Sequence, residues 1–256
     1  MDVEQLEVAE ASEPTKKSRK KINHLLSLQP GVHAIISGGT GTGKTRWVVD
    51  GILGRGVHCY PMPVDAIVCL VDSISIAQPL YDELEEKFTG AGGVKFVEGI
   101  PYEQEQEFVD AIKENKNNKM KTLIIIDDLM IAAKSAKAER FVDKLFTSIR
   151  HLNATVYEIT QTHTGSRTRR LNSGLLVTFQ TRADVGSLAH IARSIRPETK
   201  GHDVLACYRQ ATSKPHGCLI IDLVQPNQFM FRDTSLNTAF DLDAVQFDET
   251  GRPQLD

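Results

Sequence analysis

The stretch "GGTGTGKT" at residues 38–45 decides the fold, because four glycines, three threonines and a lysine build no hydrophobic core. From Gly38 to Thr45 it meets the pattern G-x-x-x-x-G-K-[ST]. In that pattern backbone amides cradle phosphates, the lysine reaches the β- and γ-phosphates, and the hydroxyl binds Mg²⁺. The candidates for the phosphate site are Gly38, Gly39, Thr40, Gly41, Thr42, Gly43, Lys44 and Thr45.

The flanking segments match the context that such a loop requires. "VHAIIS" (32–37) is rich in β-branched residues and predicts a strand, and "RWVVDGIL" (46–53) predicts a helix. A helix that begins under bound phosphates adds its own partial positive charge. The loop therefore predicts ATP binding with Mg²⁺, and Trp47 is expected in the core rather than stacked on a base.

Composition places the chain among ordinary globular proteins. Its 256 residues are 41% hydrophobic and 25% charged, which fits one α/β domain with extensions. There is no apolar run of about 18 residues, so no membrane-spanning helix is expected. The net charge of −3 argues against a strongly basic surface for nucleic acid but leaves a local basic groove open.

The N-terminus and the cysteines bear on the compartment. The first residues are acidic and lack an apolar segment, which argues against a signal peptide. None of the four cysteines forms a C-x-x-C pair, and two of them lie in apolar runs. Buried free thiols are expected, as in the cytosol or nucleus.

Three regions are predicted along the chain. Residues 1–28 form a disordered charged arm, with five acids in residues 1–15 followed by the five bases of "KKSRKK" (16–21). That basic run fits a nuclear localisation signal, a polyanion-binding tail or a merely solubilising segment. Residues 29–234 form the P-loop ATPase domain, and residues 235–256 form an acidic peripheral tail.

Apolar strands alternate with helical stretches in the central region. Strands are predicted at 32–37, 66–72, 122–127, 155–160, 175–180, 217–223 and 229–234, and helices at 75–88, 102–115, 138–152 and 185–195. Alternating units of this kind indicate an α/β fold with a mostly parallel central sheet covered by helices on both faces. The last two strands have little helix between them and predict an antiparallel end to the sheet.

Two carboxylates follow the most apolar of these strands. "TLIIIDDLM" (122–130) ends in Asp127 and Asp128. Parallel sheets place their ligand sites at this carboxyl end, so Asp127 is predicted to bind Mg²⁺ opposite the Thr45 hydroxyl. Asp128 is predicted to orient an attacking water. The alternative is two acids that only close a strand. The "AIVCLVD" strand (66–72) is expected to insert between the strands that carry the two motifs.

The next strand and loop supply further candidates. "TVYEITQ" (155–161) ends in Gln161, a neutral amide suited to position water or sense hydrolysis, or only to cap a loop. The loop "THTGSRTRRLNSG" (162–174) carries Arg167, Arg169 and Arg170. Three arginines in four residues favour phosphate contacts, to DNA or to a neighbour's ATP, over a flexible solvated loop. No metal role is assigned to His163 or His216.

Several of these segments carry a family resemblance. "ITQTHTGSRTRRLNSGLLVTFQ", "ATSKPHGCLIIDL" and "MFRDT", with the P-loop and "IIIDDLM", cover residues 31–234. Together they resemble the genome-packaging ATPases of Polinton- and adintovirus-like double-stranded DNA viruses. These are relatives of the poxvirus-type packaging ATPases within the FtsK–HerA superfamily.

The resemblance implies ATP-driven translocation of double-stranded DNA into a capsid, at a portal-like vertex, by a homo-oligomeric ring. It implies phosphate binding by residues 38–45, Mg²⁺ binding by Asp127, water activation by Asp128 and sensing by Gln161. It points to Arg167 and Asn172 in the loop. We expect Arg167 to act on a neighbour's γ-phosphate, and Arg169 and Arg170 to contact DNA.

One departure and several alternatives remain. The family shows Pro-Arg-Asp after the fifth strand, where this chain has "TRAD" (181–184), so Arg182 is a second candidate for the arginine that completes a neighbour's site. A helicase or recombination motor of the same superfamily, or a nucleotide-switched assembly module, are the alternative functions. An ABC-type ATPase is disfavoured, because the sequence contains no "LSGGQ"-like signature. The expected location is a virus assembly site in the host nucleus or cytoplasm, or the virion.

Overall fold

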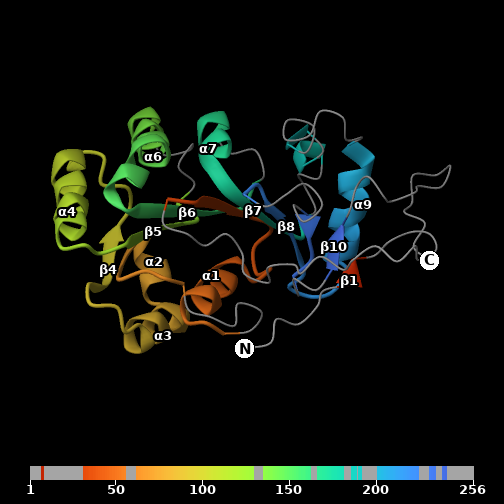
Figure 1. Ribbon diagram of the computed structural model, residues 1–256, viewed down its shortest axis with the longest axis horizontal. Helices are drawn as coiled ribbons and strands as arrows, with labels where there is room; N and C mark the ends of the chain where they lie inside the picture. Colours follow the sequence, from red (N-terminus) through yellow and green to blue (C-terminus); the bar gives the residue numbers. More distant parts are fainter. Residues whose placement is uncertain are drawn as a thin grey trace.

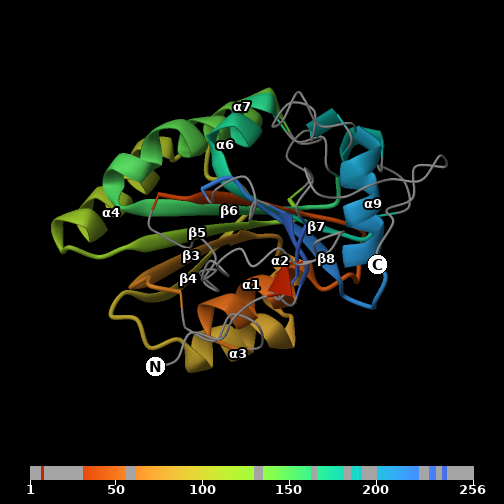
Figure 2. The same ribbon diagram turned by 45° about the vertical axis from the view of Figure 1, so that its right-hand side comes forward.

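The computed structural model describes residues 7–8, 31–55, 62–129, 135–162, 166–181, 186–188, 190–191, 201–224, 231–234 and 238–240. Within them a single twisted sheet is covered by helices on both faces (Figures 1 and 2).

The sheet has ten strands in the order β1-β10-β9-β8-β7-β2-β6-β5-β3-β4 among the described residues. From β7 to β4 all neighbours run parallel, and β7, β8, β9 and β10 pair antiparallel to one another in turn. The strands are β1 Glu7–Val8, β2 His33–Ser37, β3 Ala66–Val71, β4 Gly93–Glu98, β5 Thr122–Asp127, β6 Ala154–Thr160, β7 Ser173–Phe179, β8 Cys218–Asp222, β9 Phe231–Arg232 and β10 Thr238–Phe240.

The helices divide between the two faces of the sheet (Figure 2). Helices α1, α2 and α3 lie on one side, and α4, α6 and α7 lie on the other, with α9 at the antiparallel end (Figure 1). Their bounds are α1 Lys44–Ile52, α2 Ser73–Ile76, α3 Pro79–Lys87, α4 Glu105–Asn117, α6 Ala136–Ser148 with a 3₁₀ turn Ile149–Leu152, α7 Arg167–Asn172 and α9 Gly201–Ala211.

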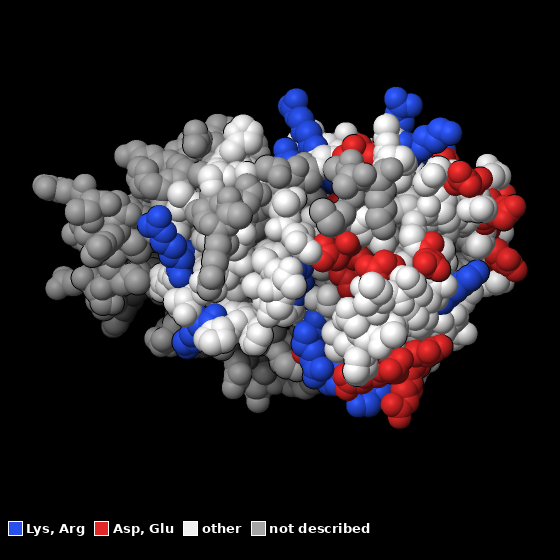
Figure 3. Space-filling view, turned by 180° about the vertical axis from the view of Figure 1, so that it is seen from behind, with Lys and Arg blue, Asp and Glu red and all other residues white. Residues whose placement is uncertain are grey.

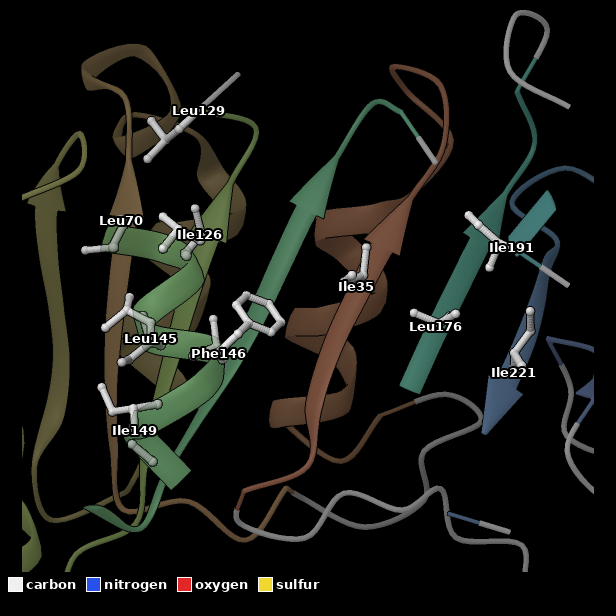
Figure 4. Close-up of a cluster of buried hydrophobic side chains, with 14 of the residues drawn as sticks. Ile35, Leu70, Ile126, Leu129, Leu145, Phe146, Ile149, Leu176, Ile191 and Ile221 are labelled. Atoms are coloured by element: carbon white, nitrogen blue, oxygen red, sulfur yellow. The ribbon is translucent and has the colours of Figure 1, made fainter. Parts of the chain in front are cut away.

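Alternate residues of each central strand point into two separate hydrophobic cores. In β5, Ile124 and Ile126 face α6, while Leu123 and Ile125 face α1 and α3. Figure 4 shows the first core, in which Leu145, Phe146 and Ile149 lie over the sheet residues Leu70, Ile126 and Ile35. Because both faces are covered, these strands are continuous apolar runs rather than alternating ones.

The predicted α/β class, the mostly parallel sheet and the antiparallel C-terminal end are confirmed. The predicted place of the 66–72 strand is wrong. Strand β3 lies outside β5, and the strand between β2 and β5 is β6. All these strands are apolar and β-branched, so local sequence does not determine their order in the sheet.

Several elements differ from the sequence prediction. The half-exposed edge strand β4 and the helix α9 were not predicted. The predicted helix 75–88 is two helices, because Pro79 occupies the first turn of α3 and starts a new helix there. The arginine-bearing segment is the short helix α7 rather than a loop.

The predicted terminal regions lie outside the described residues except for two short strands. Glu7–Val8 from the N-terminal arm pairs in parallel with Thr238–Ala239 from the acidic tail. Of the predicted helix 185–195, residues 186–188 and 190–191 are helical. In the part of the chain that the structure describes, no helix has the length and apolar character to cross a bilayer.

Candidate functional site

Four loops meet at the carboxyl ends of β2, β5, β6 and β7. The Gly38 amide donates to the Thr160 carbonyl (3.2 Å) and the Gly39 amide to the Gln180 carbonyl (3.0 Å). The Asp128 amide donates to the Ile159 carbonyl at 3.0 Å. The phosphate-loop candidates are thereby fixed between the ends of β6 and β7, beside the two carboxylates that follow β5.

Two glycines of residues 38–45 are required by the backbone. A Cβ at Gly38 would lie 2.6 Å from Cβ of Phe179, a distance at which the strand end would have to shift. Gly43 has φ of 99° and directly precedes the first residue of α1. Since side-chain-bearing residues rarely adopt that angle, glycine at position 43 allows the chain to turn from the loop into the helix.

Lys44 is the first residue of α1 and is buried. Its ammonium donates to the carbonyls of Gly38 and Gly39, both at 2.9 Å. Burial lowers the pKa of Lys44, while the nearby Asp128 and Asp127 raise it. The ammonium is thus held beneath the loop, where an incoming phosphate can replace the two carbonyls.

Asp127 is the last residue of β5 and accepts two hydrogen bonds at one carboxylate oxygen. Thr45 Oγ1 donates to Asp127 Oδ2 at 3.0 Å, as the sequence predicted that these two side chains would be neighbours. Tyr81 of α3 donates its hydroxyl to the same oxygen at 2.5 Å. Burial raises the pKa of Asp127, and the two hydrogen bonds lower it.

The donor set fits Mg²⁺, which prefers oxygen ligands and is often held by one or two side chains plus substrate phosphates. The Thr45 hydroxyl and the Asp127 carboxylate supply two oxygens side by side, next to Lys44 and the loop. Cys69, on the neighbouring strand β3, is buried near Asp127, and burial, with the charge of Asp127, raises the pKa of its thiol.

Asp128 and Gln161 are brought together across β5 and β6. The Gln161 amide nitrogen donates to Asp128 Oδ2 at 2.6 Å. Asp128 has φ of 49°, a left-handed angle that turns its side chain away from the direction of the strand. Asp128 is half-buried and Gln161 is exposed, so both can meet water beside the phosphate loop.

Sequence reasoning missed two residues of this site. Tyr81 gave no local signal, because its partner Asp127 comes from a distant strand. His216, at φ of 60°, places Nδ1 3.2 Å from the Thr42 carbonyl, and its ring contacts the position of a Cβ at Gly43. The segment "KPHG" that the resemblance singled out therefore lies against the phosphate loop.

The prediction for Arg169 is corrected by the structure, because this side chain lies in the interior and is only 3% exposed. Its guanidinium donates to Glu158 of β6 and, at 3.1 Å, to Glu139 of α6, and its Nε lies 3.0 Å from Asp143 Oδ1. The expectation that Arg169 contacts DNA phosphates is therefore wrong in this structure. Two acids of α6 and one acid of β6 pair with it. Removing one partner of such a buried pair typically costs about 3–5 kcal/mol.

The other residues of the loop are placed as follows. Arg167 is exposed at the first residue of α7, and Arg170 is half-buried. Asn172 donates within the same helix to the Thr168 carbonyl at 2.8 Å. Arg182 lies outside the described residues. The roles predicted for Arg167 and Arg170 remain predictions.

Solved structures resemble this arrangement, although no family model and no curated protein matches the chain. The crystal structure of B204, the DNA-packaging ATPase from Sulfolobus turreted icosahedral virus, aligns with a TM-score of 0.57 and 15% identity over 80% of this chain and 97% of that one.

The genome packaging NTPase B204 of Sulfolobus turreted icosahedral virus 2 has also been solved with nucleotide analogues. The complex with AMPPCP aligns with a TM-score of 0.52 and 16% identity, over 76% of this chain and 94% of that one. The complex with ATP-γS aligns with a TM-score of 0.51 and 15% identity, over 76% of this chain and 93% of that one. The chain has the P-loop NTPase fold. At this identity the likeness shows the fold alone.

Charge is unevenly distributed on the face shown in Figure 3. Acidic side chains gather toward the end formed by α3, β4 and α4, and lysines and arginines are scattered along the top edge and across the middle of the face. Asp82, Glu85 and Glu86 of α3 and Glu107, Asp110 and Glu114 of α4 are exposed. The described residues of this face therefore form no broad basic surface, in keeping with the net charge of −3.

Proposed function

We propose that this protein hydrolyses ATP to translocate double-stranded DNA into a viral capsid. The observation that carries the proposal is the meeting of five side chains at one sheet edge. Lys44 lies under the glycine loop, Thr45 and Asp127 lie 3.0 Å apart, and Asp128 accepts from Gln161 at 2.6 Å. Phosphate binding, a metal site and a water-orienting pair are what phosphoryl transfer to water requires.

The roles follow from the chemistry of each group. The loop amides and the start of α1 favour the phosphate charge, and Lys44 exchanges its carbonyl partners for phosphate oxygens. Thr45 and Asp127 would hold Mg²⁺, which neutralises charge that develops on the phosphates. Asp128 orients and polarises water, and Gln161 fixes that carboxylate through its amide.

Two lines of evidence favour DNA packaging: a resemblance in sequence motifs and a likeness in fold. The sequence segments around the P-loop, the "LNS" helix and "KPHG" resemble packaging ATPases of Polinton-like viruses. Proteins of the same fold include the B204 packaging NTPases. We propose a homo-oligomeric ring at a capsid vertex, with Arg167 facing a neighbour's γ-phosphate and Arg170 contacting DNA, at the virus assembly site.

The test combines turnover with images of the assembly. ATP hydrolysis by the full chain is measured with and without linear double-stranded DNA, with Lys44→Ala as the inactive control. Native mass and electron microscopy with DNA and ATP-γS then give the assembly. Stimulation by duplex DNA and a closed ring around it are expected.

Each failure has a distinct meaning. If the wild-type protein binds ATP without hydrolysing it, the motor function is rejected and the alternative of a nucleotide-switched assembly module is favoured. Stimulation by single strands or forks but not by duplex would favour a helicase. Packaging itself requires DNA protected from nuclease in the presence of capsids, and its absence with active rings would reject the capsid role.

A further inference from the structure

Helix α7 is too short to be stable by itself. It has six residues, and its one leucine, Leu171, is 71% exposed. Isolated helices below about 12 residues are marginal in water, so contacts from the rest of the domain must hold α7 in place. Its first residue is Arg167, whose position therefore depends on those contacts.

The contacts that hold α7 converge on Arg169. Its buried guanidinium reaches Glu158 on β6 and Glu139 and Asp143 on α6. The Ser166 hydroxyl, just before α7, donates to the second oxygen of Asp143 at 3.0 Å. The Ser173 hydroxyl, just after α7, donates to the Arg169 carbonyl at 2.9 Å.

The partner on β6 stands close to the site in sequence and in space. Glu158 lies on β6, which ends at Thr160, directly before Gln161, and Arg169 follows Arg167 by two residues on α7. The buried pair therefore connects the end of β6, which leads directly into Gln161, to helix α7, which begins with Arg167. The pair between Glu158 and Arg169 thus connects the two ends of this chain segment, and Glu139 and Asp143 bind the same guanidinium from α6.

We infer that Arg169, through its ion pair with Glu158, is a positioning residue that holds Gln161 and Arg167 in one fixed arrangement for hydrolysis. Arg169 touches neither nucleotide nor DNA in this role. The inference rests on the ATPase function proposed above. A group misplaced by about 1 Å can cost on the order of 10²-fold in rate, so even a small shift of α7 is measurable.

The chain offers a matched control. Arg232 of β9 and Asp222 of β8 form a second buried ion pair at 2.7 Å, both with 0% exposure. This pair joins two antiparallel strands, β8 and β9, which lie on the other side of β7 from β2 and β6. Arg232→Met and Arg169→Met both remove a buried guanidinium, so a general loss of stability is common to the two variants.

The experiment measures kcat and KM for ATP in Arg169→Met, Glu158→Leu, Glu158→Gln and Arg232→Met, below the melting temperature of each. Hydrogen exchange of the α7 amides is followed in the same proteins without nucleotide. The double variant Glu158→Leu/Arg169→Met leaves no unpaired member of this ion pair, and it carries the test if a single variant does not fold.

Arg169→Met and Glu158→Leu are expected to lose about tenfold or more in kcat with KM unchanged, and to exchange the α7 amides faster. Glu158→Gln keeps an acceptor for Arg169 and is expected to retain most of kcat. Equal loss of kcat in Arg232→Met, or unchanged kcat in Arg169→Met, would overturn the inference. If the wild type lacks ATPase activity, the proposed function fails, and unchanged exchange in α7 then rejects the positioning role separately.

Discussion

His33 lies at the start of β2, the strand that leads into the phosphate loop, with 1% exposure. Its Nδ1 accepts the Val156 amide of β6 at 3.0 Å, and its ring packs edge-on against Phe146. Burial, and secondarily the charge of Arg150, lower the pKa of His33 from 6.5 to about 4. Between pH 6.5 and about 4, this imidazole is therefore neutral in the folded protein and protonated in the unfolded chain.

The sign of the pH dependence follows from proton uptake. Between pH 6.5 and about 4 the unfolded state binds one more proton at His33 than the folded state, so stability falls as the pH falls through that window. The full pKa shift corresponds to about 3 kcal/mol in the free energy of unfolding, of which about 2 kcal/mol is lost between pH 7 and pH 5.

The assay is urea unfolding followed by fluorescence of Trp47, the single tryptophan, at pH 7, 6 and 5. His33→Asn is the matched variant, because its amide oxygen can accept the Val156 N–H but does not titrate. The variant starts less stable, since it leaves space beside Phe146, but its stability should fall less on acidification. Parallel curves for wild type and His33→Asn would show that another group causes the acid sensitivity.

Three further predictions concern the site. Asp128→Asn should bind ATP-γS as the wild type does by calorimetry but hydrolyse ATP about 10²–10⁴-fold more slowly, and an unchanged rate would make Asp128 structural. Tyr81→Phe removes a buried hydroxyl that donates to Asp127, so the free energy of unfolding in urea should drop by about 1.5–3 kcal/mol; no change would mean that this hydrogen bond contributes nothing net. Arg167→Ala should nearly abolish turnover with normal ATP affinity, and mixing it with inactive Lys44→Ala subunits should restore part of the rate. Complete lack of recovery in rings shown to be mixed would count against action on a neighbour's site.

The features that sequence predicted well are those that local chemistry specifies. Gly38 and Gly43 are needed by backbone geometry at two positions, and a strand and a helix flank the loop as the pattern demands. Asp127 closes a fully buried strand, so its place at the ligand edge followed from the parallel sheet. The contact between Thr45 and Asp127 is a consequence of these two facts.

The features that sequence did not predict depend on distant partners. Arg169 appeared as one of three similar arginines, and only the fold brings Glu139, Asp143 and Glu158 around it. The position of β6 beside β2 is likewise not specified by local sequence, because several buried strands could occupy that place. Strand β4 escaped prediction because it is half-exposed and carries Lys95 and Glu98 within a mixed pattern.

The same strand β4 has a consequence for solubility. It is the last strand at its end of the described sheet, so one row of its backbone N–H and C=O groups has no neighbouring strand there. Such an edge can template the addition of further chains, which would grow into open-ended aggregates. The exposed charges of Lys95 and Glu98 oppose that growth. Replacing both with β-branched apolar residues is therefore expected to promote edge-to-edge pairing between copies of the chain.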